Sequence, residues 1–266
     1  GAELIGGSTP WADAEVLSLA CKGLSHVGVN SYSLVVGHLG FIGALLESLG
    51  LSARARLFLL SSASSLKEEG PATERVYEQA RSLGLLPPVD QEVALPVVHK
   101  VEMELANLER LEKGGGLTVG VRTPDEIRER YKKKQAESDD PKRFRDALDM
   151  VCRVVRVSGR PESALRQVRD FVGDKRGKKE LDSLEDTLEA LSTYNLQVPV
   201  ALDFGLARGI AYYTGTVFEL MHSSMDVGQS LAGGGRYDGL IQALGGRVGV
   251  PAMGFTWALD RVVEAM

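Results

Sequence analysis

Residues 208–219 read Arg-Gly-Ile-Ala-Tyr-Tyr-Thr-Gly-Thr-Val-Phe-Glu, a dense run of hydrogen-bonding side chains that leads into a strand-like segment. The arginine carries a planar fork of donors that suits a phosphate or a carboxylate. A tyrosine hydroxyl suits a polar ring held in an apolar slot. On these residues alone two interpretations stay open: a ligand site, or a pair of core tyrosines beside a surface ion pair.

A second segment, residues 232–240, reads Ala-Gly-Gly-Gly-Arg-Tyr-Asp-Gly-Leu. Consecutive glycines in a strand cost conformational entropy and provide no side-chain packing. The pattern therefore favours close approach of the backbone to a ligand or to another chain, with a bulge or a tight sheet crossing as the alternative. The spacing matches neither a P-loop nor a Rossmann turn.

A third segment, residues 254–261, reads Gly-Phe-Thr-Trp-Ala-Leu-Asp-Arg and predicts a strand that leads into a helix. The amides at a helix N-terminus, together with Arg261, form a possible anion site. The alternative is an ordinary surface pair of Asp260 and Arg261.

Periodicity and turn residues predict the remaining elements. A strand ends within residues 1–7, and a helix begins at Ser8-Thr9-Pro10 with Asp13 and Glu15 near its positive end. Further strands are predicted at 33–36, 198–203, 216–220 and 229–237. Further helices are predicted at 41–49, 102–111, 125–137, 142–155, 161–172, 180–194 and 256–266, the last with Ala258, Leu259, Val262, Val263 and Met266 on its inner face.

Two β-rich blocks thus flank a long helical segment. We expect a sheet domain formed by residues 1–50 and 197–266, interrupted by a helical insertion at 51–196. Two basic clusters fall in the insertion, at 128–134 and 175–179. Each is either a solvated surface or a local contact for RNA.

The composition is that of an ordinary globular protein: 266 residues, 44% hydrophobic, 25% charged, with a net charge of −5. Cys21 and Cys152 lie far apart without metal-ligand spacing, so we expect a reducing, cytoplasmic setting, two buried thiols and no metal site. We expect no membrane helix and no signal peptide. The first residue is not Met, which suggests a fragment of a longer protein.

Taken together and in this order, the segments 208–219, 233–240 and 251–261 resemble the histidyl-tRNA synthetase family. The opening Gly-Ala-Glu-Leu-Ile-Gly and the Ala-Asp-Ala-Glu-Val at 12–16 resemble the strand closing motif 2 and the helix after it. The resemblance covers 1–50 and 197–266 well, and covers the insertion only in length and helical character. It implies an α+β class II fold, an antiparallel sheet flanked by helices, with a helical insertion that contacts the tRNA acceptor stem.

The resemblance also implies a reaction. Histidine and ATP, with Mg²⁺, form histidyl-adenylate and pyrophosphate, and the histidyl group then passes to tRNA(His); a homodimer is implied too. Arg208 would contact the α-phosphate and the substrate carboxylate, and Arg261 would hold the far phosphates of ATP. Glu3 and Tyr213 would hydrogen-bond the imidazole. The histidine and adenosine pocket would be lined by Tyr212, Tyr237, Gly233, Gly234 and Gly235.

Three departures from the family pattern raise an alternative. Ala211 stands where Asp is common, and motif 1 and the motif 2 arginine are absent because the chain begins after them. The segment 35–40, which includes His38, lacks the Asn-x-Arg common in synthetases. It is similar to the regulatory subunit of ATP phosphoribosyltransferase, a non-catalytic histidine-binding paralogue whose partner is the catalytic subunit, and which also lacks an anticodon-binding domain. The retained Arg208 and Arg261 favour the enzyme.

Overall fold

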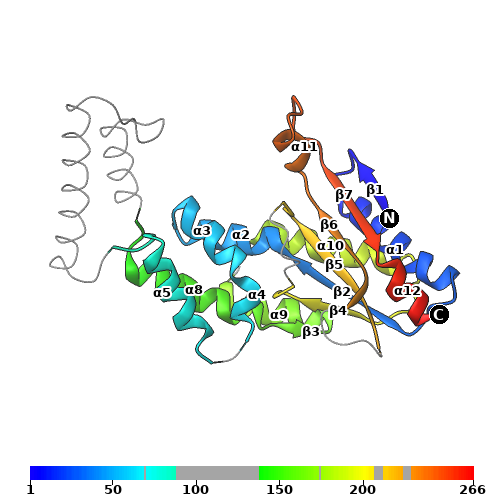
Figure 1. Ribbon diagram of the computed structural model, residues 1–266, viewed down its shortest axis with the longest axis horizontal. Coiled ribbons are helices and arrows are strands. Elements are labelled where there is room, and N and C mark those ends of the chain that lie inside the picture. Colours follow the sequence, from blue (N-terminus) through cyan, green and yellow to red (C-terminus); the bar gives the residue numbers. More distant parts are fainter. Residues whose placement is uncertain (69, 88–137, 174, 207–211, 224–228) are drawn as a thin grey trace, which may run out of the picture.

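Seven strands form one sheet in the computed structural model, which describes residues 1–68, 70–87, 138–173, 175–206, 212–223 and 229–266 (Figure 1). The strand order is β1-β7-β6-β5-β2-β4-β3. Neighbouring strands run antiparallel except β2 and β4, which are parallel. The strands are β1 (Ala2–Ile5), β2 (Tyr32–His38), β3 (Ser158–Gly159), β4 (Val200–Asp203), β5 (Thr216–His222), β6 (Ser230–Arg236) and β7 (Ala252–Trp257). The predicted α+β fold is confirmed, with one parallel pair in the sheet.

Helices flank this sheet and form an extension at one end of the molecule (Figure 1). They are α1 (Pro10–His26), α2 (Leu39–Ser48), α3 (Ala53–Ser61), α4 (Ala63–Leu66), α5 (Ala72–Ser82), α8 (Pro141–Val155), α9 (Pro161–Val172), α10 (Lys178–Ser192), α11 (Leu240–Ala243) and α12 (Leu259–Ala265). The helices predicted at 142–155, 161–172 and 180–194 are confirmed as α8, α9 and α10. Those predicted at 102–111 and 125–137 lie outside the described residues.

Helix α1 begins where the sequence predicts it. The Thr9 hydroxyl accepts a hydrogen bond from the Ala12 amide at 3.3 Å, and Pro10 occupies the first turn. Leu17, Ala20 and Leu24 are buried in the main hydrophobic core. This apolar side packs the helix against β7 and α10.

Alternation along the strands gives the sheet two different faces. On one, which we call the core face, Phe218, Phe255 and Val36 lie in neighbouring register positions with Gly234, and the three large side chains join the main core. The other, which we call the glycine face, carries one row of residues from five adjacent strands. That row is Glu3, Gly254, Gly235, Val217 and Gly37.

The C-terminal helix differs from the prediction. Thr256 and Trp257 complete strand β7, so α12 begins only at Leu259. Of its predicted inner face, Val262 is buried, whereas Leu259 and Val263 are each 70% exposed and Met266 is 73% exposed. The predicted apolar face is therefore wrong, because the short helix that starts at Leu259 turns Val262 and Ala265 to the core.

The division into a sheet domain and an insertion at 51–196 remains a prediction. Strand β3 pairs with β4, and α10 packs against α1, so parts of the predicted insertion adjoin the sheet domain. One hydrophobic core contains residues from both ranges, among them Leu24 and Leu184.

Candidate functional site

A carboxylate and a tyrosine meet at the edge of the glycine face. Tyr237 directly follows β6, and its hydroxyl donates a hydrogen bond to the Glu3 carboxylate of β1. The Tyr237 amide donates to the Ala252 carbonyl at 2.8 Å, which fixes the backbone there. Burial raises the pKa of Tyr237, and the hydrogen bond and charge of Glu3 raise it further. Tyr237 therefore stays protonated and keeps its donor near neutral pH.

Two further tyrosines complete an aromatic cluster with Tyr237. The ring centroid of Tyr212 lies 4.9 Å from that of Tyr213 and 5.9 Å from that of Tyr237, the latter in an edge-on arrangement. Tyr213 is 9% exposed and packs with Leu39 and Val217, whereas Tyr212 is 41% exposed. The structure thus brings together Glu3 and the three tyrosines named from the sequence.

Glycines allow these side chains to lie directly against the sheet. A methyl group at Gly254 would lie 1.6 Å from the Glu3 carboxylate, so that carboxylate rests directly over the Gly254 backbone. A methyl group at Gly235 would lie 2.9 Å from the Tyr213 ring. Gly233 and Gly235 occupy the glycine face, whereas Gly234 occupies the core face, where a methyl group would lie 2.1 Å from the Gly254 carbonyl oxygen.

The two predicted arginines are placed differently. Nη1 of Arg261 donates to the Ser230 carbonyl oxygen at 2.9 Å. Ser230 begins β6 and Tyr237 follows its end, so Arg261 and Tyr237 lie at opposite ends of a strand roughly 20 Å long. Arg208 and Ala211 lie outside the described residues.

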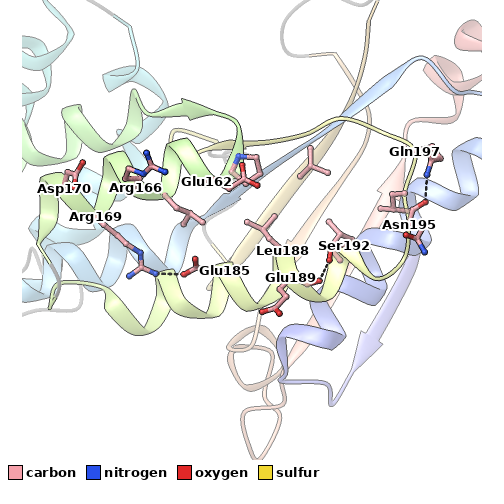
Figure 2. A pocket seen from close by; sticks show the side chains of 15 residues that line it. Glu162, Arg166, Arg169, Asp170, Glu185, Leu188, Glu189, Ser192, Asn195 and Gln197 are labelled. Carbon is pink, nitrogen blue, oxygen red and sulfur yellow. Dashed lines mark hydrogen bonds and ion pairs between the residues drawn. The ribbon is translucent and has the colours of Figure 1, made fainter.

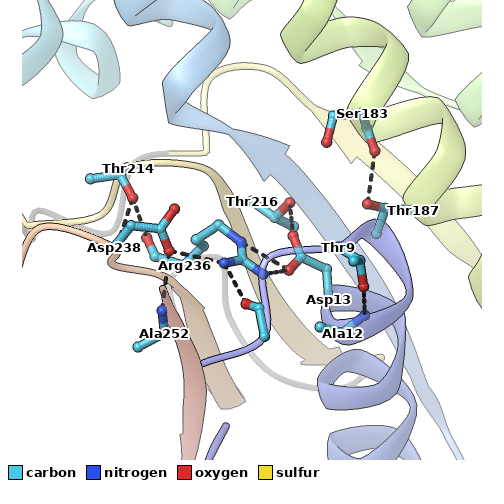
Figure 3. Close-up of polar contacts among 11 residues, drawn as sticks. Thr9, Ala12, Asp13, Ser183, Thr187, Thr214, Thr216, Arg236, Asp238 and Ala252 are labelled. Carbon is cyan, nitrogen blue, oxygen red and sulfur yellow. Dashed lines mark hydrogen bonds and ion pairs between the residues drawn. The ribbon is translucent and has the colours of Figure 1, made fainter. Parts of the chain in front are cut away.

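A charge network centred on the buried Arg236 and Asp13 was not predicted from the sequence (Figure 3). The Arg236 guanidinium donates to the Asp13 carboxylate through Nε at 2.9 Å and also through Nη2. Its Nη1 donates to the Gly7 carbonyl at 3.0 Å and to Asp238 Oδ1 at 2.9 Å. The Thr216 hydroxyl donates to the other Asp13 oxygen at 2.7 Å. The sequence shows Arg236 within a motif and Asp13 near a helix start, but no pattern there links the two.

Charge pairing keeps Arg236 ionised despite its burial. Burial by itself lowers the pKa of Arg236, but the hydrogen bonds and charges of Asp13 and Asp238 outweigh it and raise the pKa overall. His38, also buried, uses Nδ1 to accept from the Phe41 amide at 3.0 Å and so caps α2. Burial, reinforced by the Arg236 charge, lowers the pKa of His38 to about 4.

A separate hollow of about 1050 Å³ lies between α9 and α10 (Figure 2). Leu165 and Leu188 line it, and Arg169 reaches across to Glu185 at 2.8 Å. None of the site residues predicted from the sequence lines this hollow. It is therefore distinct from the aromatic cluster.

The other sequence expectations have mixed outcomes. Cys21 and Cys152 are buried free thiols, and burial raises the pKa of Cys21 to about 12. Within the described part of the chain, no three His, Cys, Asp or Glu side chains are grouped to hold a metal ion, and no helix is long and apolar enough to span a membrane.

The basic cluster at 175–179 adjoins the start of α10, where Lys178 pairs with Asp182. The cluster at 128–134 lies outside the described residues.

The chain is similar in sequence to proteins with two different names. The chain is 29% identical over 267 residues to an ATP phosphoribosyltransferase regulatory subunit from Geobacillus thermodenitrificans, and 28% identical over 270 residues to a histidine–tRNA ligase from Gloeobacter violaceus. Both alignments cover 100% of this chain, but 50% and 44% of the respective relatives. The chain thus spans about half the length of these curated relatives.

Solved structures show the same fold. A histidyl-tRNA synthetase from a Nostoc species superposes with a TM-score of 0.61 at 15% identity, covering 98% of this chain and 48% of that one. A Bacillus halodurans protein described as an ATP phosphoribosyltransferase regulatory subunit/histidyl-tRNA synthetase gives 0.57 at 22% identity, covering 99% and 52%. The sequence model described as histidyl-tRNA synthetase matches residues 1–111 and 125–262. This chain therefore belongs to the histidyl-tRNA synthetase family.

Proposed function

We propose that this chain binds histidine on the glycine face and, within its full-length protein, activates it with ATP as the catalytic core of a histidine–tRNA ligase. The observation that carries the proposal is the Tyr237–Glu3 hydrogen bond, set beside Tyr212 and Tyr213 over a row of glycines. A carboxylate, hydroxyls and aromatic rings suit a small polar ring such as imidazole.

Imidazole recognition needs one partner for each ring nitrogen. In its neutral form one nitrogen donates and the other accepts. We assign Glu3 to accept the N–H and Tyr213 to donate to the other nitrogen. Tyr237 is assigned a supporting role, because its hydroxyl already donates to Glu3 and so orients that carboxylate. Such a site rejects rings that lack either nitrogen, because its own polar groups would then be left unpaired.

The glycine face provides room for the rest of the substrate. Gly233, Gly235 and Gly254 present backbone instead of side chains along the middle of the sheet. Backbone without Cβ atoms permits close approach of a ligand. Because Glu3 already covers Gly254 and Tyr213 lies against Gly235, we place the amino-acid backbone and the adenosine beside these side chains along the glycine face, with Tyr212 at the exposed side.

The chemistry is proposed as adenylate formation. A carboxylate oxygen of histidine attacks the α-phosphorus of ATP, the bond to the bridging oxygen breaks, and pyrophosphate leaves. The tRNA(His) 3′-terminal hydroxyl then attacks the acyl carbon and AMP leaves. Arg208 is assigned to the α-phosphate, and Arg261, already anchored on the Ser230 carbonyl, to the far phosphates. Mg²⁺ would accompany ATP and offset charge on its phosphates. We further propose that the protein acts as a homodimer in the cytoplasm.

A second candidate is a regulatory subunit of ATP phosphoribosyltransferase, which would bind histidine at the same residues and pair with the catalytic subunit. The observation in its favour is that a relative with that name matches this chain over its whole length at an identity similar to that of a ligase. Burial and capping of α2 account for His38 in either case. The two candidates therefore share the histidine site and differ in whether bound histidine reacts with ATP.

The test is histidine-dependent ATP–pyrophosphate exchange by the full-length protein, together with calorimetric titration with histidine. Glu3→Gln should raise the histidine Kd at least about tenfold, because a hydrogen bond to a charged group is lost. Glu15→Gln, an exposed carboxylate on α1, is the matched control and should leave the Kd unchanged. Arg208→Ala should abolish exchange while histidine binding stays measurable.

Each outcome separates the candidates. Exchange specific for histidine supports the ligase, and histidine binding without exchange supports the regulatory subunit. The absence of histidine binding by the wild-type protein contradicts both.

A further inference from the structure

We propose that Arg236 is a positioning residue, which holds Glu3, Tyr213 and Tyr237 in register with one another through a buried hydrogen-bond network. The inference deepens the proposed function, because the three residues are those assigned to histidine. It rests on where the network's bonds end: several reach backbone segments that carry one of these residues, and others reach α1 and β7, which adjoin them (Figure 3).

The guanidinium contacts three segments of the chain directly, two of which carry Glu3 and Tyr237. Its contact with the Gly7 carbonyl fixes the turn that follows β1, the strand of Glu3. Its contact with Asp238 fixes the residue after Tyr237. Its paired contacts with Asp13 fix the first turn of α1.

Further hydrogen bonds, which do not involve the guanidinium, extend the same network to Tyr213 and β7. The Thr214 amide donates to the Arg236 carbonyl at 2.8 Å, and the Asp238 amide donates to the Thr214 hydroxyl at 3.1 Å, which together fix the residue after Tyr213. The Ala252 amide donates to Asp238 Oδ1 at 3.1 Å, at the start of the strand that carries Gly254. Arg236 and Asp238 therefore connect both sides of the aromatic cluster.

Burial makes this geometry specific. The side chains of Arg236 and Asp13 are 10% and 6% exposed, so an altered arrangement would leave a buried charge without its partner. A lysine at 236 keeps the charge but has no fork of donors to span Gly7, Asp13 and Asp238 at once. The proposal therefore predicts that Arg236→Lys misaligns the tyrosines even though the charge is conserved.

The test compares Arg236→Lys with Tyr32→Phe. Tyr32 is also buried, and its hydroxyl donates to the Cys21 carbonyl at 2.7 Å. It pairs with His222 at one end of β5, whereas Thr216, the partner of Asp13, lies at the other end. Tyr32→Phe thus removes a buried hydrogen bond far from the aromatic cluster. Thr216→Val, which removes only the hydroxyl bonded to Asp13, is the milder variant if Arg236→Lys does not fold.

The first readout needs no ligand: NMR of labelled tyrosine rings in the full-length protein, with signals assigned by Tyr237→Phe and Tyr213→Phe. We expect Arg236→Lys, or Thr216→Val to a smaller degree, to shift the ring signals of Tyr237 and Tyr213. Tyr32→Phe should leave them in place. Unmoved signals in the Arg236 and Thr216 variants would overturn the proposal, whether or not the protein binds histidine.

The second readout is a double-mutant cycle on histidine affinity. Arg236→Lys should raise the Kd about tenfold in the wild-type background and by a clearly smaller factor in Tyr237→Phe, because part of the effect passes through the Tyr237 hydroxyl. Equal effects in both backgrounds would show that Arg236 acts independently of Tyr237. If the wild-type protein binds no histidine, the proposed function fails, while the ring signals still decide whether Arg236 positions the tyrosines.

Discussion

The two faces of the sheet consist of the same strands, yet they hold opposite kinds of residue. The core face buries Phe218, Phe255 and Val36, whereas the glycine face presents Glu3 and a row of glycines. Residues adjacent in sequence therefore lie on different faces, because successive side chains point to opposite sides of a strand. A shift of one residue in register would exchange the two sets, so the packing of the core face also fixes what the glycine face presents.

The largest predicted effect comes from removing a large side chain from the core face. Phe218→Ala should lower the free energy of unfolding by about 3–5 kcal/mol, because Phe218 is fully buried and its loss leaves a cavity. Urea denaturation measures the change. Thr256→Ala, an exposed position on the glycine face of β7, is the control and should stay within about 0.5 kcal/mol. Similar losses in both variants would contradict the division into two faces.

His38, at the polar edge of the core face, is predicted to give the next largest effect, a change of stability with pH. His38 has a pKa of about 4 when folded and about 6.5 when unfolded, so the unfolded chain binds more protons between these values. The stability that neutral His38 contributes is complete above pH 6.5 and is lost as the pH falls towards 4, by about 3 kcal/mol in all. His38→Asn retains a capping acceptor but does not titrate. Unfolding free energies measured from pH 4 to 7 should therefore fall less steeply in the variant, and equal slopes would contradict the assignment.

The smallest predicted effects come from alanine substitutions at two glycines in adjacent strands, Gly234 and Gly254. In Gly234→Ala the methyl group meets the backbone of β7, so the strands must separate and stability should fall by about 1–3 kcal/mol. In Gly254→Ala the three atoms nearest to the methyl group all belong to the end of the flexible Glu3 side chain. Stability should then change by less than about 1 kcal/mol, while displacement of Glu3 raises the histidine Kd about tenfold.

Urea denaturation and calorimetric titration of both glycine variants provide the measurements. A Gly254→Ala protein that binds histidine normally would remove Glu3 from the site. A Gly234→Ala protein of wild-type stability would show that β6 and β7 are not closely packed there.

Much of the fold was predictable because its signals are local. Thr9 and Pro10 mark the start of α1, the alternating segment 216–220 marks β5, and the glycine-rich segment 229–237 marks β6. The end of β7 was missed because Thr256 and Trp257 fit either a strand or a helix start, and only pairing with β6 decides between them. The same error in the helix start led to the wrong prediction that Leu259 faces the core.

The candidate site was predictable in part, and for a different reason. Resemblance to one family named Tyr212, Tyr213 and Tyr237 through two of its motifs and Glu3 through the opening segment, and the structure brings these residues together. It gave no indication of the bond between Arg236 and Asp13, since residues so distant in sequence meet only after the sheet has formed. A buried ion pair of this kind leaves no periodic signal, and each of its members has an ordinary local explanation.

The pairing of β1 with β7 bears on synthesis by the ribosome. Glu3 belongs to the first strand of this chain, and its register partner Gly254 belongs to the seventh. While the intervening residues are translated, β1 lacks β7, the strand with which it pairs in the folded sheet. The nascent chain can form α1 and pair β2 with β5, yet the Glu3–Tyr237 contact requires Tyr237, and the seat of Glu3 requires Gly254. The Glu3–Tyr237 contact is thus completed only after β7 has been translated, although Glu3 itself is translated before all the other strands described here.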